Sequence, residues 1–348
     1  MSIPSLPLCS SNMRSRFHVR RPFTAVAWTM AVAVVAGCGS SSGGGSVRVS
    51  IPSGSNFSTA VDSLAHAGVV SSPRFFRLYA SARGRDRELK AGTYVFRRGA
   101  SWNEVIDALT RGKGLVHTVT IPEGFALANI ATLLGRALSV PPESIIVAAT
   151  DSALRRRLDV PTPTLEGYLF PDTYTFAEGT SPHEAVRVLV ATFEKVWKPE
   201  WNARLQELAM SRHDIITLAS IIEKEARLAE ERPVISAVYH NRLKIGMLLQ
   251  ADPTVQYALG KHVDRVLYKD LEVDSRYNTY KHPGLPPGPV ASPGAASIEA
   301  ALYPASVPYL YFVAHPDGHH EFRQTFSQHT EARAQIRRAT PPRPSKNN

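Results

Sequence analysis

Residues 214–230 read DIITLASIIEKEARLAE and form the strongest helical pattern in the chain. Asp214 can cap the amino end of this helix, because a short acidic side chain accepts backbone N–H groups there. The apolar residues recur at helical spacing and share one face: Ile215, Leu218, Ala219, Ile222, Ala226 and Ala229. At about 100° per residue, Glu225 falls inside this apolar stripe, Glu223 lies near its edge and Lys224 points away. The pattern therefore directs one carboxylate, that of Glu225, toward the interior or a cleft.

Helix geometry alone leaves two interpretations of Glu225 open. Desolvation would raise the pKa of its carboxyl, as a general acid working near neutral pH requires. Alternatively, the carboxylate pairs with an arginine such as Arg232 or Arg242. Glu223 and Glu225 are two residues apart and do not face one another on a helix. They therefore do not suit a retaining glycosidase, whose two carboxyls lie about 5 Å apart, and glycosidic chemistry here would use a single carboxylate.

The sequence beyond this helix mixes amides, hydroxyls and tyrosines. A second helix is expected from Arg232-Pro233 to Gly246, because proline is tolerated in a first turn. Three short segments follow: 250–255 (QADPTV), 277–280 (YNTY) and 284–289 (GLPPGP). Sugar-binding clefts use such amides for hydroxyl groups and aromatic faces for pyranose rings. The same residue types form ordinary turns, so each segment taken singly is a weak signal.

Other chemistries have less support in the sequence. His315, His319 and His320 lie in the stretch AHPDGHHEF, where the glycine favours a hairpin turn over a metal site. The chain contains no glycine-rich phosphate loop and no Gly-x-Ser-x-Gly elbow. Its two cysteines, Cys9 and Cys38, both precede the body, which therefore has no disulfide and no cysteine metal site.

Residues 47–119 alternate short β-like runs with amphipathic helices. Strands are expected at 47–51, 92–96 and 117–121. Ser101 followed by Glu104 predicts a capping box at the start of a helix. This β–α–β pattern carries no cluster of titratable residues, so it indicates a binding or spacing module and not a catalyst.

Composition and charge set the broad class. The chain has 348 residues, 43% hydrophobic and 20% charged, which suits about two folded domains with tails and excludes wholesale disorder. The net charge of +10 is concentrated in basic ends around a nearly neutral body. Such a body is a poor nucleic-acid binder, whereas basic flanks suit an anionic membrane or envelope surface.

The N-terminal 38 residues resemble an export signal. Four arginines precede an apolar run at residues 22–36. As a helix this run would span about 22 Å, short of the bilayer core of about 30 Å. Its end, VAGC, resembles a bacterial lipobox in which Cys38 becomes lipid-modified, although a short transmembrane anchor is the alternative. Residues 39–46 (GSSSGGGS) form a flexible linker, and residues 331–348 form a basic, proline-rich tail.

Taken in order, ten segments of the chain resemble the YceG-like endolytic peptidoglycan transglycosylases over about residues 47–330. They are AGTY (91–94), PEG (122–124), EGYLFPDT (166–173), LASIIEKE (218–225), NRL (241–243), GM (246–247), LQADPTV (249–255), YNTY (277–280), GLPPG (284–288) and PYLYFV (308–313). The resemblance implies an α+β protein. A small LysM-like module (47–119) would precede a mixed α/β catalytic domain (120–330), behind a membrane tether.

The family's activity is cleavage of the MurNAc–GlcNAc bond of peptidoglycan strands, which leaves a 1,6-anhydro-MurNAc end and would terminate glycan elongation. The resemblance places the catalytic acid at Glu225, the residue that the helix face also selects, and requires no metal or other cofactor. Candidate substrate-binding residues are Glu223, Asn241, Gln250, Asp252, Thr254, Tyr277, Asn278 and Tyr280.

The resemblance also implies where the protein acts and with what. The body would lie outside the cell membrane on peptidoglycan strands, with peptidoglycan synthases as possible partners and no nucleic acid. Two alternatives remain open. A hydrolytic muramidase would need a second carboxylate, Asp252 or Asp172, and the other alternative is a non-catalytic glycan-binding scaffold of the cell-wall synthesis machinery.

Overall fold

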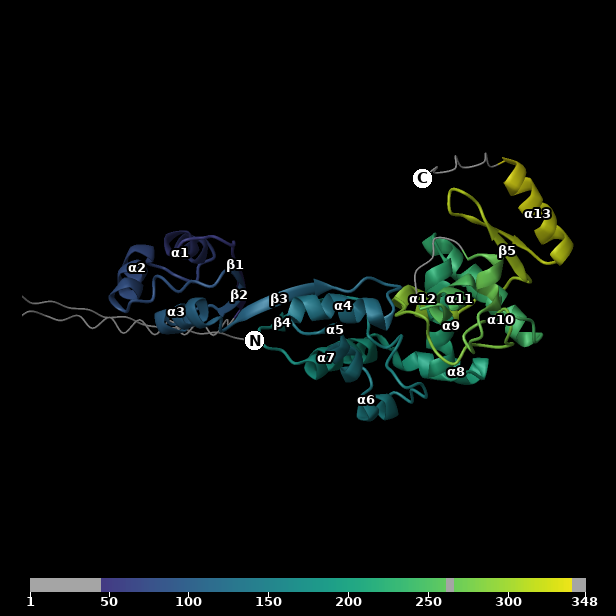
Figure 1. Ribbon diagram of the computed structural model, residues 1–348, viewed down its shortest axis with the longest axis horizontal. Coiled ribbons are helices and arrows are strands. Elements are labelled where there is room, and N and C mark those ends of the chain that lie inside the picture. The colour runs from purple at the N-terminus through teal and green to yellow at the C-terminus, as the bar shows by residue number, and fades with distance from the viewer. Residues whose placement is uncertain (1–44, 261–265, 340–348) are drawn as a thin grey trace, which may run out of the picture. The chain divides into compact units, whose positions relative to one another are not determined.

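The computed structural model describes residues 45–260 and 266–339. The predicted export signal, Cys38 and nearly all of the predicted linker lie outside the described residues, as do residues 340–348. The described chain is a mixed α/β protein with two antiparallel sheets (Figure 1).

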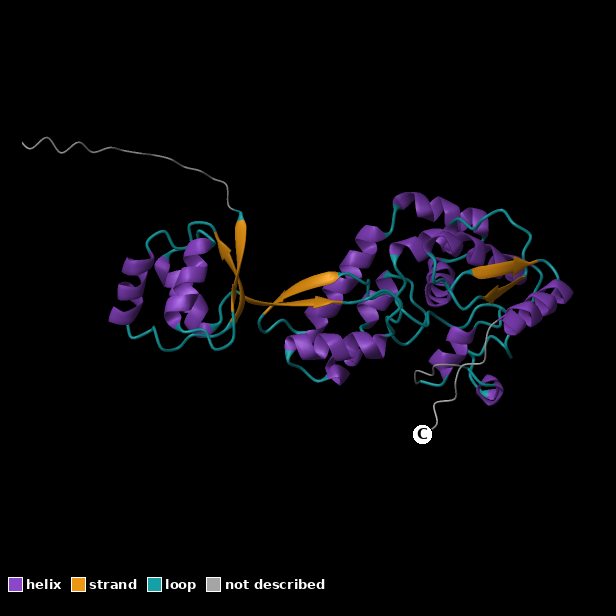
Figure 2. Cartoon of the chain, turned by 90° about the horizontal axis from the view of Figure 1, so that it is seen from above, coloured by secondary structure: helices purple, strands orange, loops and turns teal. Residues whose placement is uncertain are grey.

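A four-stranded antiparallel sheet runs in the order β1-β2-β3-β4 (Figure 2). Its strands are β1 (Ser46–Ile51), β2 (Gly92–Arg97), β3 (Leu115–Thr120) and β4 (Thr173–Ala177). The first three confirm the strands predicted from the sequence to within two residues at each end. Six residue pairs join β1 to β2 and five join β3 to β4, whereas only two join β2 to β3.

The N-terminal part of the body has its own hydrophobic core. Three helices share this core with β1 and β2: α1 (Phe57–His66), α2 (Pro73–Ala82) and α3 (Trp102–Arg111). The predicted capping box is confirmed at α3, where the Ser101 hydroxyl accepts from the Glu104 N–H and the Glu104 carboxylate accepts from the Ser101 N–H. Gly112 ends α3 in the left-handed conformation that glycine adopts at low cost.

A second, larger core begins at β3 and extends to the C-terminal helices. The elements that contribute to it or flank it are α4 (Leu127–Leu138), α5 (Pro142–Ala148), α6 (Ser152–Arg157), α7 (Pro182–Val196), α8 (Pro199–Leu208), α9 (Arg212–Glu225), α10 (Arg232–Lys244), α11 (Asp252–Ala258) and α12 (Ala295–Leu302). Two 3₁₀ turns complete this region, η1 (Ala229–Glu231) and η2 (Tyr268–Glu272).

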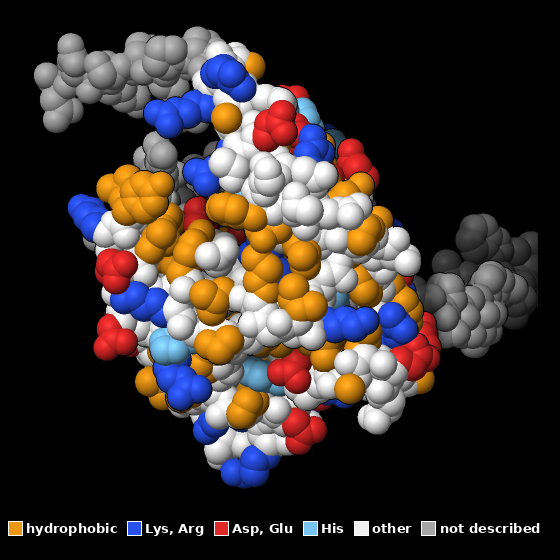
Figure 3. Space-filling model, turned by 90° about the vertical axis from the view of Figure 1, so that its right-hand side faces the viewer, with side chains coloured by type: hydrophobic (Ala, Val, Ile, Leu, Met, Phe, Trp, Pro, Cys, Tyr) orange, Lys and Arg blue, Asp and Glu red, His pale blue; other side chains and the backbone are white. Residues whose placement is uncertain are grey.

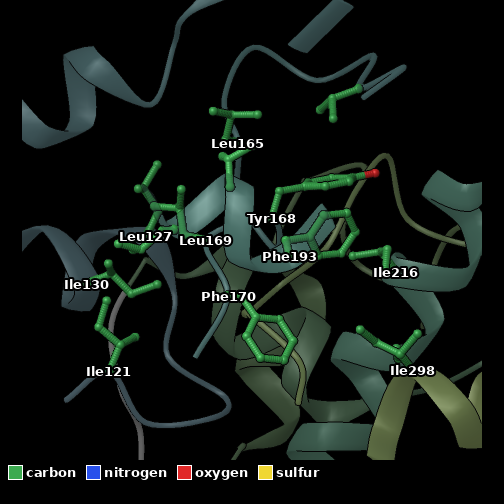
Figure 4. Packing of buried hydrophobic residues seen from close by; sticks show 14 of the residues in the cluster. Ile121, Leu127, Ile130, Leu165, Tyr168, Leu169, Phe170, Phe193, Ile216 and Ile298 are labelled. Carbon is green, nitrogen blue, oxygen red and sulfur yellow. The ribbon is translucent and has the colours of Figure 1, made fainter. Parts of the chain in front are cut away.

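The segment before β4 lies at the centre of this second core. Leu165, Tyr168 and Leu169 are fully buried, and the rings of Tyr168 and Phe193 meet edge to face at 5.1 Å (Figure 4). Gly167 has a φ of +82°, and a side chain there would lie 2.4 Å from a proline ring. A glycine is therefore required where this segment passes close to its neighbour.

A two-stranded hairpin and a helix end the described chain. The hairpin consists of β5 (Tyr311–Ala314) and β6 (His320–Arg323), and α13 (Phe326–Ala339) follows it. The predicted tail boundary at residue 331 is therefore wrong, because it falls inside α13. The predicted boundary between residues 119 and 120 falls inside β3, the strand that pairs with both β2 and β4.

Within the described part, no single helix is long and apolar enough to cross a membrane. Only α4 and α5 taken together reach that length and composition, as a pair bent by 118°. Their apolar side chains, including Ile130, Leu134 and Ile145, are buried in the second core.

Candidate active site

Helix α9 carries Glu225 on its last turn. The helix begins at Arg212 and not at Asp214, because Ser211 is the N-cap and forms a capping box with Asp214. The predicted end at residue 230 is also wrong: the backbone becomes extended at Ala226. Since the carboxyl end of a helix is the negative end of its dipole, it disfavours a further negative charge on Glu225.

Glu225 lines a pocket of about 760 Å³. Arg242 of α10 and the segment around Gln250, Asp252 and Tyr280 line the same pocket. The remaining walls come from β5, β6, α13 and residues 266–271. Figure 3 shows the side of the molecule that holds the C-terminal elements, where apolar side chains are interspersed with Lys, Arg and acidic residues. A concave site with aromatic side chains and a few convergent polar groups is a candidate ligand-binding site.

The surroundings of Glu225 favour a protonated carboxyl. Burial and the nearby Asp252 carboxylate raise the pKa of Glu225 to about 7. Two groups oppose that rise: the Tyr239 hydroxyl donates to Glu225 Oε1 at 3.3 Å, and the Arg242 guanidinium is close enough to favour the anion. Glu225 forms no ion pair with any residue that the structure describes. Of the two interpretations left open by the sequence, the geometry favours the desolvated acid, which can exist in both protonation states near neutral pH.

The predicted residues Gln250, Asp252 and Tyr280 do meet Glu225 in the pocket. The Tyr280 hydroxyl donates to Asp252 Oδ1 at 2.6 Å, and Asp252 is the first residue of α11. Gln250 has a φ of +51°, a left-handed conformation that is uncommon for a non-glycine residue. Such backbone strain concentrates at functional sites, where the surrounding structure maintains it.

Two further candidates, Thr254 and Asn278, are fully buried and support the pocket from behind. The Thr254 hydroxyl lies 2.8 Å from that of Thr279, which also accepts the Ala251 N–H. The Asn278 amide donates to two backbone carbonyls, those of Leu271 and Val273. Their predicted role in sugar binding is therefore wrong, because their polar atoms are committed to holding the loop that carries Tyr280.

Three more of the predicted residues do not line the pocket either. The Asn241 amide donates to the carbonyls of residues 307 and 309, at 2.9 Å each, and so anchors the chain before β5. Tyr277 packs against Tyr257 with ring centroids 4.7 Å apart. Asp172, the alternative second carboxylate, is exposed at the start of β4 and accepts the N–H of the next residue.

Glu223 also faces away from the pocket, as a structural carboxylate. It accepts hydrogen bonds from the Gly294 N–H at 3.1 Å and the Ser297 hydroxyl at 2.7 Å, which fixes the start of α12. Arg232 lies 3.7 Å from its other oxygen, and the Glu223 side chain is only 8% exposed. Arg232, suggested as a partner of Glu225, therefore pairs with Glu223.

Sequence reasoning missed His320. The predicted turn is present between β5 and β6, but His320 follows it as a buried residue that lines the pocket. Its Nδ1 lies 2.6 Å from Glu231 Oε2, and its backbone N–H donates to Glu231 Oε1 at 2.7 Å. The partner is 89 residues away in sequence, so no local pattern signals the pairing. Among the described residues, no group of His, Cys, Asp and Glu is placed to hold a metal ion.

Comparisons with known proteins are consistent with this geometry. The YceG-like family matches residues 49–335. An endolytic murein transglycosylase of Bacillus subtilis (strain 168) is 37% identical over 303 residues, covering 82% of this chain and 84% of the relative. An endolytic murein transglycosylase of Streptococcus pneumoniae (serotype 2, strain D39) is 31% identical over 77% of this chain, which spans only 54% of that relative. Among solved structures, a yceG-like protein from Listeria monocytogenes has a TM-score of 0.60 and 34% identity, covering 82% of this chain and 98% of its own.

Proposed function

This chain belongs to the YceG-like family, and we propose that it acts as an endolytic murein transglycosylase with Glu225 as its acid–base residue. The observation that carries the proposal is the desolvated Glu225 carboxyl, whose pKa of about 7 lets it both give and take a proton in the pocket. The substrate is a peptidoglycan glycan strand, cleaved within its length between MurNAc and GlcNAc.

In the first step the protonated Glu225 donates its proton to the glycosidic oxygen. The bond between that oxygen and the muramoyl anomeric carbon breaks, and the ring gains oxocarbenium character. The Asp252 carboxylate, held by the Tyr280 hydroxyl, stabilises this positive charge from the same pocket. Tyr239 donates to the Glu225 carboxylate that remains.

In the second step the muramoyl C6 hydroxyl attacks the anomeric carbon. The Glu225 carboxylate takes the proton of that hydroxyl, so the residue returns to its starting state. The product end is 1,6-anhydro-MurNAc, and no water, metal or other cofactor enters the reaction. An internal nucleophile suits a site with one acid–base carboxylate, and such a cleavage would end elongation of the strand.

The other parts of the chain are assigned by the same proposal. Residues 47–119 form a LysM-like module that holds the glycan strand, and its hydrophobic core is separate from the core that contains α9. Cys38 or the apolar run before it tethers the protein to the bacterial membrane, with the body on the outer side. Peptidoglycan synthases, which make the strands, are the proposed partners.

The product decides between this reaction and hydrolysis. Purified protein is incubated with intact peptidoglycan, and the released muropeptides are analysed by mass. We expect 1,6-anhydro ends, whereas a muramidase using Asp252 to activate water would give products heavier by one water. Binding of the strands without any new ends would instead support a scaffold.

A further inference from the structure

Helix α13 presents one face to the pocket. Phe326, His329 and Arg333 all line it, and their spacing of three and four residues places them on the same side of the helix. Arg337, one turn further along, is exposed and does not line the pocket. The predicted sugar-binding segments do not include α13, so this wall has no role in the cleavage described above.

The α13 side of the pocket is cationic. Neither Arg333 nor Arg242 forms an ion pair with a residue in the described ranges. The Arg242 guanidinium donates instead to the backbone carbonyls of Leu310 and Leu249, at 2.7 and 2.6 Å, and lies over the Tyr311 ring. Arg242 is close enough to Glu225 to favour its anion, but neither arginine has a carboxylate of the described residues within ion-pair distance. These two positive charges favour an anionic ligand group.

His329 adds an unused hydrogen-bonding atom to this wall. Its ring stacks on Tyr311 at 5.4 Å and lies 6.4 Å from Phe326. Its Nδ1 is buried and has no hydrogen-bond partner. A buried polar atom without a partner is costly unless a ligand satisfies it.

We propose that Phe326, His329 and Arg333 form a subsite for the acidic stem peptide carried by the muramoyl lactyl group. The inference rests on the proposed function, because it names the part of the same substrate that this wall binds. Along a glycan strand the sugars are neutral, whereas the stem peptide carries free carboxylates. Arg333 and Arg242 attract these carboxylates, and the aromatic groups pack against the peptide's aliphatic atoms.

The test measures binding, so it does not depend on turnover. Full-length protein carrying Glu225→Gln is titrated with solubilised glycan strands that keep their stem peptides. It is also titrated with the same strands after an amidase has hydrolysed the lactyl–peptide bond, which leaves one lactyl carboxylate on each MurNAc in place of the carboxylates of the peptide. The ratio of the two dissociation constants measures how strongly the protein prefers strands with stem peptides over strands without them. We expect the protein with the native α13 residues to bind peptide-bearing strands more tightly than strands without peptides. Arg333→Gln should reduce this preference about 3- to 5-fold, the range for one exposed charge. Added salt should lower it further.

Arg337→Gln is the matched control, because it removes the same charge from the same helix outside the pocket. It should leave the ratio unchanged. Equal affinity for the two kinds of strand, or an equal effect of both substitutions, would overturn the inference. If strands bind with discrimination but the protein with an intact Glu225 releases no 1,6-anhydro ends, the proposed function fails and the peptide subsite stands.

Discussion

Replacing Glu225 with glutamine tests the centre of the proposed mechanism. Glutamine keeps the shape of the side chain and can still accept the hydrogen bond from the Tyr239 hydroxyl. It has no acidic proton to transfer to the glycosidic oxygen. We expect release of 1,6-anhydro muropeptides to fall by about 10²- to 10⁴-fold, the range for loss of general acid–base catalysis. The wild-type kcat/KM should decline as the pH rises through about 7, where Glu225 loses its proton.

The same substitution has a predictable effect on stability. The pKa of Glu225 rises on folding from 4.5 to about 7. Below pH 4.5 Glu225 is protonated in both the folded and the unfolded state, so its ionisation does not change the free energy of unfolding. Between pH 4.5 and about 7 the Glu225 carboxyl is ionised in the unfolded state but still protonated in the folded state. As the pH rises through this range, the free energy of unfolding of the wild type falls relative to that of the variant, by up to about 3 kcal/mol. Solvent in the pocket reduces the expected figure to about 1–2 kcal/mol.

Glu223→Gln provides the control, because it removes a carboxylate two residues away that contacts α12 and Arg232 instead of the pocket. It should lower the free energy of unfolding by about 1–3 kcal/mol and leave the activity of the folded protein within a few-fold of wild type. Both variants are assayed by mass analysis of the muropeptides and by urea denaturation between pH 4 and 8. Activity retained by Glu225→Gln but lost in Glu223→Gln would refute the assignment and the helix-face reasoning together.

Three further substitutions test the architecture around the site. Gly167→Ala should destabilise the protein by about 2–4 kcal/mol in urea denaturation, because the position has a φ of +82° and no room for a methyl group; an unchanged midpoint would show that the backbone relaxes freely. Tyr280→Phe removes the hydrogen bond to Asp252, so turnover should fall by about 5- to 30-fold, while the melting temperature, measured by circular dichroism, changes little. Glu231→Ala leaves two donors of the buried His320 without their acceptor and should cost about 2–3 kcal/mol of stability, a result that calorimetry checks and that a neutral effect would contradict.

Local sequence patterns predicted several features correctly because those features depend on near neighbours. The capping box of α3 involves residues three apart, and the strands β1 to β3 follow short alternating runs. The helix period predicted an inward-facing Glu225, and Glu225 does line a pocket, although α9 is buried on all sides from Ile215 to Ile222 and not on one face. Family membership, carried by ten ordered segments, extended this to the kind of reaction.

Other features depended on contacts between distant segments. The turns around residues 250 and 278 contain similar polar residues, yet Asp252 reaches the pocket while Asn278 bonds to backbone carbonyls. A polar side chain takes whichever partner the folded chain brings near, because an unpaired buried group is costly.

Contacts between segments that are distant in sequence separate what the tertiary structure decided from what the sequence determined. Helical periodicity predicted one buried face for α9, but packing buries every residue from Ile215 to Ile222. The end of the helix at Glu225, which the sequence did not show, places the carboxylate on the pocket wall. His320 and its partner Glu231 are 89 residues apart, and α13 closes the pocket more than 100 residues after Glu225. The sequence by itself determined the fold class and the catalytic carboxylate that we propose. Long-range packing alone decided which other groups surround that carboxylate, because the chain must fold before those groups can meet.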